Sequence, residues 1–428
     1  MRDIVVLLLV LGSLPLILYR PYIGILVWSW LAYMNPHRLS YGFATDFPFA
    51  QIVAIVIMVS LVFTKESRKI IWTRETTVLL LFILWMFITT LNAVHPDLAW
   101  LQFDKVIKIQ VVVFLTLIIM KDRDRLTYLA WVIVVSLGFF GIKGGIFTVL
   151  TGGGQHVLGP PKTFIGGNNE LGLALIMIIP LMRYLHLLYE QKWIKLGMVG
   201  AMALTFIAVL GTQSRGALVG VAAMGFMLAM KSRKRVTLFL MMAALVPAAL
   251  MVMPESWYDR MATIETYDED RSANERLNAW RYAYSVAERS PIVGGGYEIF
   301  VGRTDAHSIY FEVLAEHGFV GLFIFLLLGI LSWRSCTAIR KRAKDEPDRK
   351  WMLDLASMLQ VSMLGYATSG LFLGMAYFDL YYHLVAMVII LSYLSQQEDG
   401  EKNTVSVEAE KKNSRKDFDV NRRFKFRR

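Results

Sequence analysis

Three polar residues stand out beside long apolar runs, because their types and neighbours could bind and activate an anionic substrate. Arg215 lies in GTQSRGA between two apolar runs, Arg276 lies in NERLNAWR, and His307 lies in AHSIYFEV. A charge at membrane depth is costly, so it usually faces a cavity or a partner. The alternatives are an interfacial Arg215 that extends to water and a solvated helix charge at Arg276. All three residues are candidates for one anion site.

His307 has the setting of a general base. We expect Thr304 or Asp305 to cap a helix whose first turn includes His307, with Tyr310 on the same face. A helix N-terminus attracts anions and disfavours imidazolium. A neutral His307 could then accept a proton.

Other polar residues could contribute to the same face of the molecule. Gln213 and Ser214 add hydrogen-bonding capacity beside the arginine of GTQSRGA. Lys105 and Lys108 could form a structural ion pair with the neighbouring Asp104, and the alternative is that they bind an anion. We keep these four residues as candidate substrate contacts.

Metal and redox chemistry find little support in the sequence. The acidic triplet at 268–270 has a spacing found in metal-dependent sugar transferases, but such triplets also occur by chance in acidic loops. The single cysteine, Cys336, excludes an internal disulfide, and no HExxH motif or histidine cluster is present. His317 precedes Gly318 at an expected helix end, where a charged histidine suits the helix dipole and is structural. We therefore expect no metal and no cofactor.

The composition indicates a polytopic membrane protein. The chain has 428 residues, of which 56 % are hydrophobic, and a mean hydropathy of +0.48. The net charge of +11 could suggest a nucleic-acid partner. The basic residues instead cluster in short loops between apolar runs, which is the positive-inside pattern, so we expect contact with membrane lipids and no nucleic acid.

Apolar runs of spanning length predict an all-α fold with about 12 transmembrane helices. The runs lie near 3–18, 22–34, 49–64, 76–92, 104–120, 126–150, 169–189, 194–211, 216–230, 236–252, 317–333, 352–373 and 376–394. Basic loops at 65–69, 121–125, 231–235 and 340–350 predict the cytoplasmic face. The pattern leaves the side of the N-terminus open and favours an uncleaved first segment.

The same pattern predicts four regions. A stripe of Leu277, Trp280, Tyr284 and Val286 predicts an amphipathic helix in the long segment on the opposite face. The regions are N-terminal transmembrane helices (1–252), a loop with amphipathic helices on the face opposite the basic loops (253–316), C-terminal transmembrane helices (317–394) and a disordered cytoplasmic tail (395–428).

Four motifs, in this order along the chain, resemble those of the O-antigen ligase and O-antigen polymerase superfamily. They are SRGA at 214–217, R-x-x-x-W at 276–280, P-I-V-G-G-G at 291–296 and A-H-S-x-Y-x-x-x-L-A-E-x-G-x-x-G-L at 306–322. The early stretch PYIGILVWSWLAYMNPHRLSYGFA also resembles the O-glycosylation ligase branch of that superfamily. By this resemblance, Arg215 and Arg276 match the motif arginines and His307 matches the motif histidine.

The resemblance implies a GT-C-type glycosyltransferase of the Gram-negative inner membrane, with its active site facing the periplasm. It also implies that the loop at 253–316 is periplasmic. Such enzymes transfer a glycan from undecaprenyl diphosphate without metal. Ligases transfer it to the lipid A–core, polymerases to another repeat unit, and relatives to a protein hydroxyl. Arginines would stabilise the diphosphate leaving group, and a single displacement would invert the anomeric centre.

Two open points concern roles and function class. His307 is the candidate base, and Glu312 replaces it if His307 instead holds phosphate. Tyr310 and Glu312 complete the candidate substrate-binding set. A transporter of lipid-linked saccharide is the alternative function class, but it would favour inverted repeats and broken helices at the midplane.

Overall fold

The computed structural model describes residues 2–231 and 271–400 of the chain. Within these two stretches the regular elements are α-helices and short 3-10 helices, without a strand. This confirms the all-α prediction for the described part of the chain. The predicted span at 236–252, the acidic triplet at 268–270 and the tail from 401 onward lie outside it.

The helices follow the apolar runs because a backbone in hydrocarbon must satisfy its own N–H and C=O groups. They are α1 (Arg2–Tyr19), α2 (Pro21–Met34), α3 (Phe49–Phe63), α4 (Arg74–Leu91), α5 (Pro96–Ile119), α6 (Arg123–Leu150), α7 (Asn168–Leu188), α8 (Lys192–Gly211), α9 (Arg215–Lys231), α12 (Arg271–Arg289), α13 (Ile309–Ala343) and α14 (Lys350–Ser369). Short 3-10 helices are η1 (Pro36–Leu39), η2 (Phe43–Thr45), η3 (Pro347–Arg349) and η4 (Gly370–Phe372). A last helix covers residues 379–400.

Two helices begin well before the apolar runs that predicted them. Helix α5 begins at Pro96 rather than near 104, and α13 begins at Ile309 rather than near 317. Both extensions carry charged side chains, such as Asp97 in α5 and Glu312 in α13. These charges lower the local hydropathy without disturbing helical hydrogen bonding.

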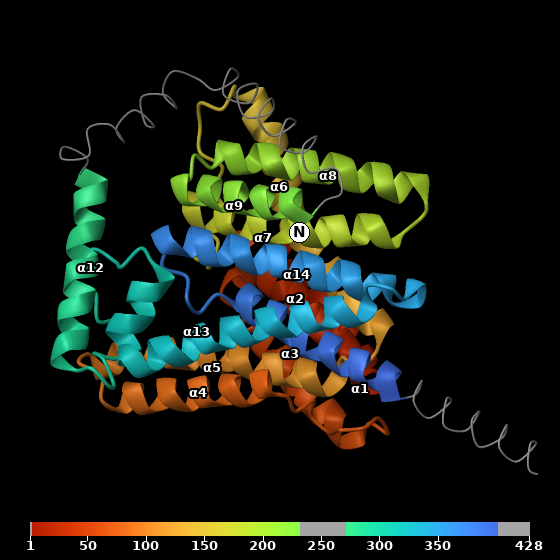
Figure 1. Cartoon of the computed structure of the whole chain (residues 1–428), viewed down its shortest axis with the longest axis horizontal. Coiled ribbons are helices and arrows are strands. Elements are labelled where there is room, and N and C mark those ends of the chain that lie inside the picture. Colours follow the sequence, from red (N-terminus) through yellow and green to blue (C-terminus); the bar gives the residue numbers. More distant parts are fainter. Residues whose placement is uncertain (1, 232–270, 401–428) are drawn as a thin grey trace, which may run out of the picture.

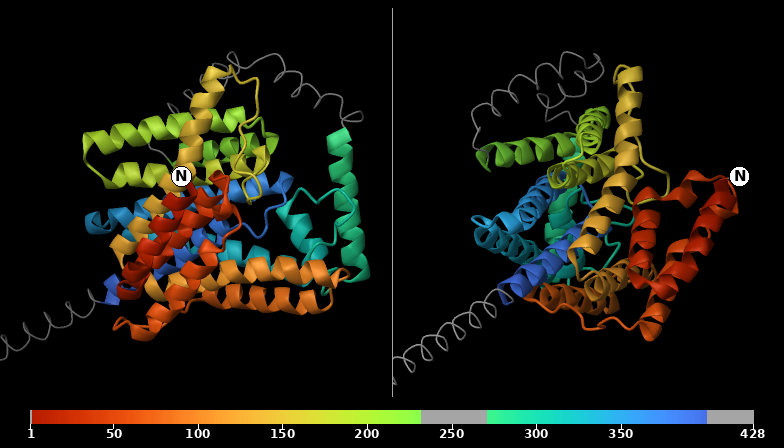
Figure 2. Two further views of the ribbon diagram at one scale, coloured as in Figure 1. Left: turned by 180° about the vertical axis from the view of Figure 1, so that it is seen from behind. Right: turned by 90° about the vertical axis from the view of Figure 1, so that its right-hand side faces the viewer.

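Figure 1 shows most of the long helices lying side by side, with α12 crossing their ends at the left of the view. The two views in Figure 2 show α1, α2 and α3 as a group on one side, where they pack on one another. Helix α14 packs against α7, α9 and α13, and α7 is buried along most of its length. The bundle therefore has two ends, of which one is covered by α12.

The opposite end collects the predicted basic loops. Arg125 Nη1 lies 2.6 Å from Glu66 Oε2, which joins the loops at 65–69 and 121–125. Arg123 lies over the ring of Trp351, 5.0 Å from its centroid, and so brings the α13–α14 connection to the same end. The structure thus places three of the four predicted basic loops together, which we call the basic end.

The disordered tail was predicted to begin at residue 395, which is too early. Residues 395–400 continue the last helix. Its end is fixed to the basic end because Glu398 Oε2 lies 2.9 Å from Arg349 Nε and Asp399 also pairs with Arg349. The charged composition that suggested disorder instead forms ion pairs with a buried arginine.

We call the end of the bundle that α12 covers the site end. The start of α1 lies beside the segment that follows α2, away from the basic end. Asp3 Oδ1 accepts hydrogen bonds from the backbone nitrogens of Gly42 and Ala44, at 3.1 and 3.2 Å. The chain reaches this segment after α2 has run from the basic end, where Arg125 lies over the ring of Tyr22. The sequence alone had not decided on which side of the membrane the N-terminus lies.

Six described helices are long and apolar enough to cross a membrane, namely α1, α4, α6, α7, α8 and α13. Helices α2, α3 and α9 are shorter and apolar. The total of about 12 spans and the GT-C architecture stay predictions.

Candidate active site

The turn between α8 and α9 places Arg215 at the first position of α9. Gln213 adopts a left-handed backbone with φ of 53°, which reverses the chain within a few residues. The Ser214 hydroxyl oxygen accepts a hydrogen bond from the Ala217 nitrogen at 3.3 Å and so caps α9. A cation at a helix N-terminus is disfavoured by about 0.3–1 kcal/mol. The position of Arg215 is therefore better suited to an anion beside it than to helix stability.

The first residue of α7 and the loop that precedes this helix hold the turn in place. Asn168 Nδ2 donates to the carbonyl oxygen of Thr212 at 2.9 Å. The buried Gln213 side chain donates from Nε2 to the carbonyl oxygen of Gly153 at 3.0 Å. The amide nitrogen of Gln213 and the hydroxyl of Ser214, two residues predicted to contact substrate, are thus engaged in fixing the turn. Asn168 has the same function, which the sequence did not reveal.

His307 does not lie in the first turn of a helix, so that prediction was wrong. Its backbone is left-handed with φ of 44°, and a left-handed residue cannot continue into an α-helix. Ser308 occupies the N-cap position of α13, and Asp305 Oδ1 accepts from the nitrogen of Ala306 at 2.7 Å. His307 is half-buried immediately before this cap. It remains close to the free N–H groups that begin α13.

Helix α12 is bonded to the residue before His307. Trp280 Nε1 donates to the carbonyl oxygen of Ala306 at 2.8 Å. The indole also stacks on Phe311, with ring centroids 5.0 Å apart and planes 14° apart. Arg276 lies one turn earlier on α12, is half-buried and therefore shares the Trp280 side of the helix.

The predicted amphipathic helix is confirmed, but its buried stripe differs from the prediction. The buried positions are Ala279, Ala283, Val286 and Ala287. Small alanines permit close approach of α12 to its neighbours. Tyr284 is 50 % exposed and lies outside this stripe.

The segments that carry Arg215 and His307 both contact the end of α14. Ser369 Oγ donates to the carbonyl oxygen of Gly216 at 2.7 Å. A Cβ atom on Gly370 would lie 2.5 Å from the Ile309 side chain, so the start of α13 is packed directly on this glycine. The three motif elements therefore meet at the site end of the bundle.

Glu312 and Tyr310 are engaged with neighbouring backbone. Glu312 Oε2 accepts from the nitrogen of Ala376 at 2.9 Å and so fixes the segment between α14 and the last helix. The Tyr310 hydroxyl donates to the carbonyl oxygen of Ala367 at 2.9 Å. Both side chains position the segments around His307.

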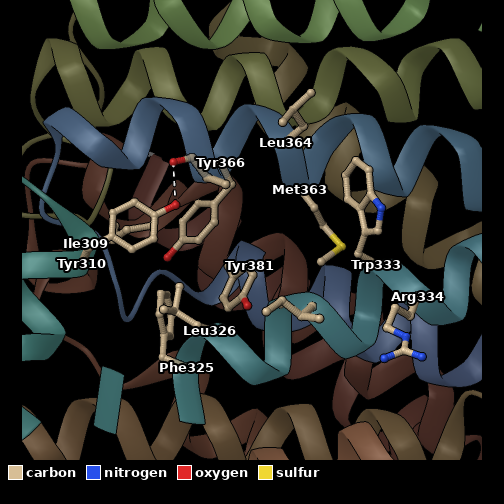
Figure 3. A pocket seen from close by; sticks show the side chains of 13 residues that line it. Ile309, Tyr310, Phe325, Leu326, Trp333, Arg334, Met363, Leu364, Tyr366 and Tyr381 are labelled. Atoms are coloured by element: carbon tan, nitrogen blue, oxygen red, sulfur yellow. Dashed lines mark hydrogen bonds between the residues drawn. The ribbon is translucent and has the colours of Figure 1, made fainter. Parts of the chain in front are cut away.

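An apolar pocket begins beside this segment and runs between α13 and α14. Its volume is about 280 Å³, and Figure 3 shows Tyr310 at one end and Trp333 and Arg334 at the other. Tyr366 and Tyr381 stack in its wall, with ring centroids 4.4 Å apart. The pocket suits a hydrocarbon chain better than a polar ligand.

His317 is structural, as predicted, but for a different reason. It is fully buried, and its Nδ1 and Nε2 lie 2.7 Å from the Thr89 hydroxyl and 2.8 Å from the Tyr377 hydroxyl. Tyr377 also donates to Glu316 at 2.5 Å. The ring is thus held by hydroxyl groups on both sides, not placed at a helix end to suit its dipole.

The two glycine-containing motifs fit into one another. Gly318 interrupts α13 with φ of 68° and ψ of −173°. The PIVGGG segment fills this break, since Phe319 nitrogen donates to the carbonyl oxygen of Pro291 and Gly295 nitrogen to that of Ala315, both at 2.8 Å. These motifs set the angle between the His307 segment and the rest of α13.

A polar cavity of about 510 Å³ opens at the site end, and Lys105 is one of its lining residues. The cations around it are Arg38, Lys105 and Lys162, and the buried carboxylate of Asp379 faces it. Sequence reasoning missed Arg38, Lys162 and Asp379 because they come from separate segments without a shared motif. Lys108 is exposed and ion-paired with Asp104 at 2.5 Å, as the structural alternative predicted.

Comparison with known families divides the chain in two. Residues 200–326 match the family described as O-antigen ligase. Residues 1–189 match a family of unknown function, DUF5935. No curated protein matches the chain.

Proposed function

From the premise that residues 200–326 form a domain of the O-antigen ligase superfamily, we propose that the protein is a periplasm-facing glycan ligase. It transfers a glycan from undecaprenyl diphosphate to the lipid A–core oligosaccharide in the Gram-negative inner membrane. The architecture would be of the GT-C type with about 12 spans. The described apolar helices and the family together support a multi-pass membrane protein.

One observation carries the proposal. The segments bearing Arg215 and His307 contact the end of α14, and α12, which bears Arg276, is hydrogen-bonded to the residue before His307. This meeting point lies at the opposite end from the basic loops. A donor in the outer leaflet would present its diphosphate at this level.

In the proposed reaction, the acceptor hydroxyl oxygen forms a bond to the anomeric carbon while the bond from that carbon to the diphosphate oxygen breaks. The proton of the hydroxyl passes to His307, and the electron pair leaves with undecaprenyl diphosphate. Arg215 and Arg276 stabilise the added negative charge, which is worth most where water is scarce. The anomeric centre is inverted.

The donor chain has a place in this scheme. The apolar pocket between α13 and α14 starts at Tyr310, close to His307 in the chain, and continues along both helices (Figure 3). A prenyl chain lying there would leave its diphosphate at the site end.

An O-antigen polymerase and a protein O-oligosaccharyltransferase are the alternatives, since both use the same donor. Lipopolysaccharide gels of wild-type and deletion cells separate them. Loss of all long chains with a retained core supports the ligase, whereas a core carrying one repeat supports a polymerase. Unchanged lipopolysaccharide with loss of a glycoprotein supports the third activity.

The decisive experiment is transfer by the purified full chain in detergent from lipid-linked donor to lipid A–core. Arg215→Ala, Arg276→Ala and His307→Ala should each lower transfer by at least a hundredfold. Arg281→Ala is the matched control, because Arg281 lies exposed on α12. Transfer near the wild-type rate by any one of the three variants would remove that residue from the mechanism, and product formation would exclude a transporter.

A further inference from the structure

Two neighbouring cavities at the site end have complementary chemistry. The polar cavity lies between the end of α2, α5, the loop at 162–165 and the start of the last helix. A second cavity of about 650 Å³ lies between α3 and α5, and we call it the α3/α5 groove. The two share His37, Arg38, Lys105 and Phe164 in their walls, so they adjoin.

The polar cavity has an excess of positive charge. Arg38 is partly neutralised by the exposed Asp46 at 3.1 Å. Lys105 makes a hydrogen bond of 3.4 Å to the neutral Gln102 and forms no ion pair with any residue in the described ranges. Lys162 adds a third cation to the wall. Charge complementarity therefore favours an anionic ligand.

Hydrogen-bonding groups in the cavity wall would recognise hydroxyl groups. Asp379 is 5 % exposed, and its Oδ1 has no hydrogen-bond partner among residues 2–231 and 271–400. The same holds for the buried Nδ1 of His37. Buried polar atoms are seldom left unsatisfied, so a ligand that donates hydrogen bonds fits here. Burial, followed by the charge of Arg38, lowers the pKa of His37 to about 4, so this ring stays neutral beside the cations.

The α3/α5 groove is about as long as one acyl chain of a lipid. Its wall extends along α3 from Phe49 to Met58 and along α5 from Lys105 to Val111. At about 1.5 Å per helical residue, the α3 wall covers about 14 Å, which is half of a hydrocarbon core of about 30 Å. This length matches one leaflet and is short for a long prenyl chain.

We propose that these two cavities bind the lipid-borne acceptor, a phosphorylated and acylated sugar, so that the region of unknown function carries the acceptor site. The phosphate lies at Lys105 and Arg38, a sugar hydroxyl donates to Asp379, and one acyl chain lies in the α3/α5 groove. This inference rests on the proposed function, which places the donor diphosphate at the arginines of residues 200–326. The lipid-linked donor and the lipid-borne acceptor would thus approach from different sides of the bundle.

The test is equilibrium binding to the purified full chain in nanodiscs, with hexa-acylated lipid A, undecaprenyl phosphate and phosphatidylglycerol as separate probes. Lys105→Gln and Asp379→Asn should each weaken binding of lipid A by about tenfold and leave undecaprenyl phosphate unaffected. Lys143→Gln is the charge-matched control, because Lys143 is exposed on α6 outside both cavities.

The groove is tested separately with Ala54→Phe, which narrows it, against Val59→Phe, which adds the same side chain elsewhere on α3. Only Ala54→Phe should weaken lipid A binding. In the transfer assay, Lys105→Gln and Asp379→Asn should each raise the acceptor KM about tenfold, with little change in the donor KM or in kcat.

Weaker binding of undecaprenyl phosphate alone would overturn the proposal and make this the donor site. Equal loss for all three lipids, or no loss for any, would also overturn it. Because binding is measured without turnover, selective lipid A binding in a protein that lacks transfer activity would contradict the proposed function while supporting the lipid site.

Discussion

The indole Nε1 of Trp280 donates a hydrogen bond of 2.8 Å to the carbonyl oxygen of Ala306, the residue immediately before His307. Helix α12 is therefore attached to the segment that carries the candidate base. Because Arg276 lies one turn away on the same helix, this bond couples the position of an arginine to that of the histidine. This contact explains the R-x-x-x-W spacing, which places the arginine one helical turn from the tryptophan that holds the His307 segment.

Trp280→Phe should lower transfer without unfolding the protein. The substitution keeps an aromatic ring to stack on Phe311 and removes the donor to Ala306. A hydrogen bond contributes about 1 kcal/mol, which corresponds to about fivefold in kcat/KM. Trp193→Phe is the control, since Trp193 is 84 % exposed. Unchanged kcat/KM for Trp280→Phe would show that this bond does not position the site.

Glu312→Gln should retain most of the transfer activity. A glutamine oxygen can still accept from the nitrogen of Ala376, so the segment stays in place. An amide cannot take up the acceptor proton, and for this reason the variant separates anchoring from catalysis. We expect a rate within about threefold of wild type and the same pH profile. A hundredfold loss with intact folding would instead identify Glu312 as the base.

Gly318→Ala should destabilise the protein strongly. Its φ of 68° with ψ of −173° belongs to a region that only glycine enters easily, and an added Cβ would lie 2.3 Å from the Ile292 oxygen. Backbone strain of this kind costs about 1–3 kcal/mol before the clash is counted. Thermal unfolding in detergent measures the loss. Gly329→Ala is the matched control, because its Cβ would meet only the Tyr381 hydroxyl at 3.4 Å.

Glu66→Gln should lower stability at neutral pH and have a smaller effect in acid. The hydrogen bond from Arg125 holds the pKa of Glu66 below its usual value, so the carboxylate stabilises the folded state. A lowered folded-state pKa means that the contribution is present above the unfolded pKa and is lost as the pH falls through the folded value. The pair is partly exposed, so we expect at most about 1 kcal/mol.

Melting temperatures of wild type and Glu66→Gln at pH 7 and near pH 3 provide the measurement. Asp345→Asn, at an exposed position of the basic end, should change neither value. A difference between wild type and Glu66→Gln that is as large at pH 3 as at pH 7 would contradict the ion-pair explanation.

Much of the helical framework could be predicted from hydropathy, since apolar runs in lipid have few alternatives to a helix. The run at 49–64 and helix α3 (Phe49–Phe63) nearly coincide. The start of α5 could not be found in this way, because hydropathy records polarity and not backbone conformation. His307 was misplaced for a related reason, since its left-handed φ depends on how Ser308 begins α13.

The candidate site was predictable only where residues share a motif. Arg215, Arg276 and His307 are each marked by their neighbours in sequence. Asp379 and Arg38 are not, because their relationship arises from segments that meet only after folding. The hydrogen bond from the Ala376 nitrogen to Glu312 could not be predicted from the sequence for the same reason.

The attachment of Asp3 to the segment at Gly42 has a consequence for how the chain is threaded through the bilayer. Arg2 and Asp3 lie away from the basic end, beside the segment from Leu39 to Ala44, whereas Asp399 lies at the basic end beside Arg349. A chain whose two ends face opposite compartments crosses the membrane an odd number of times. A reporter fused before Arg2 and one fused after residue 400 should therefore report opposite sides of the membrane.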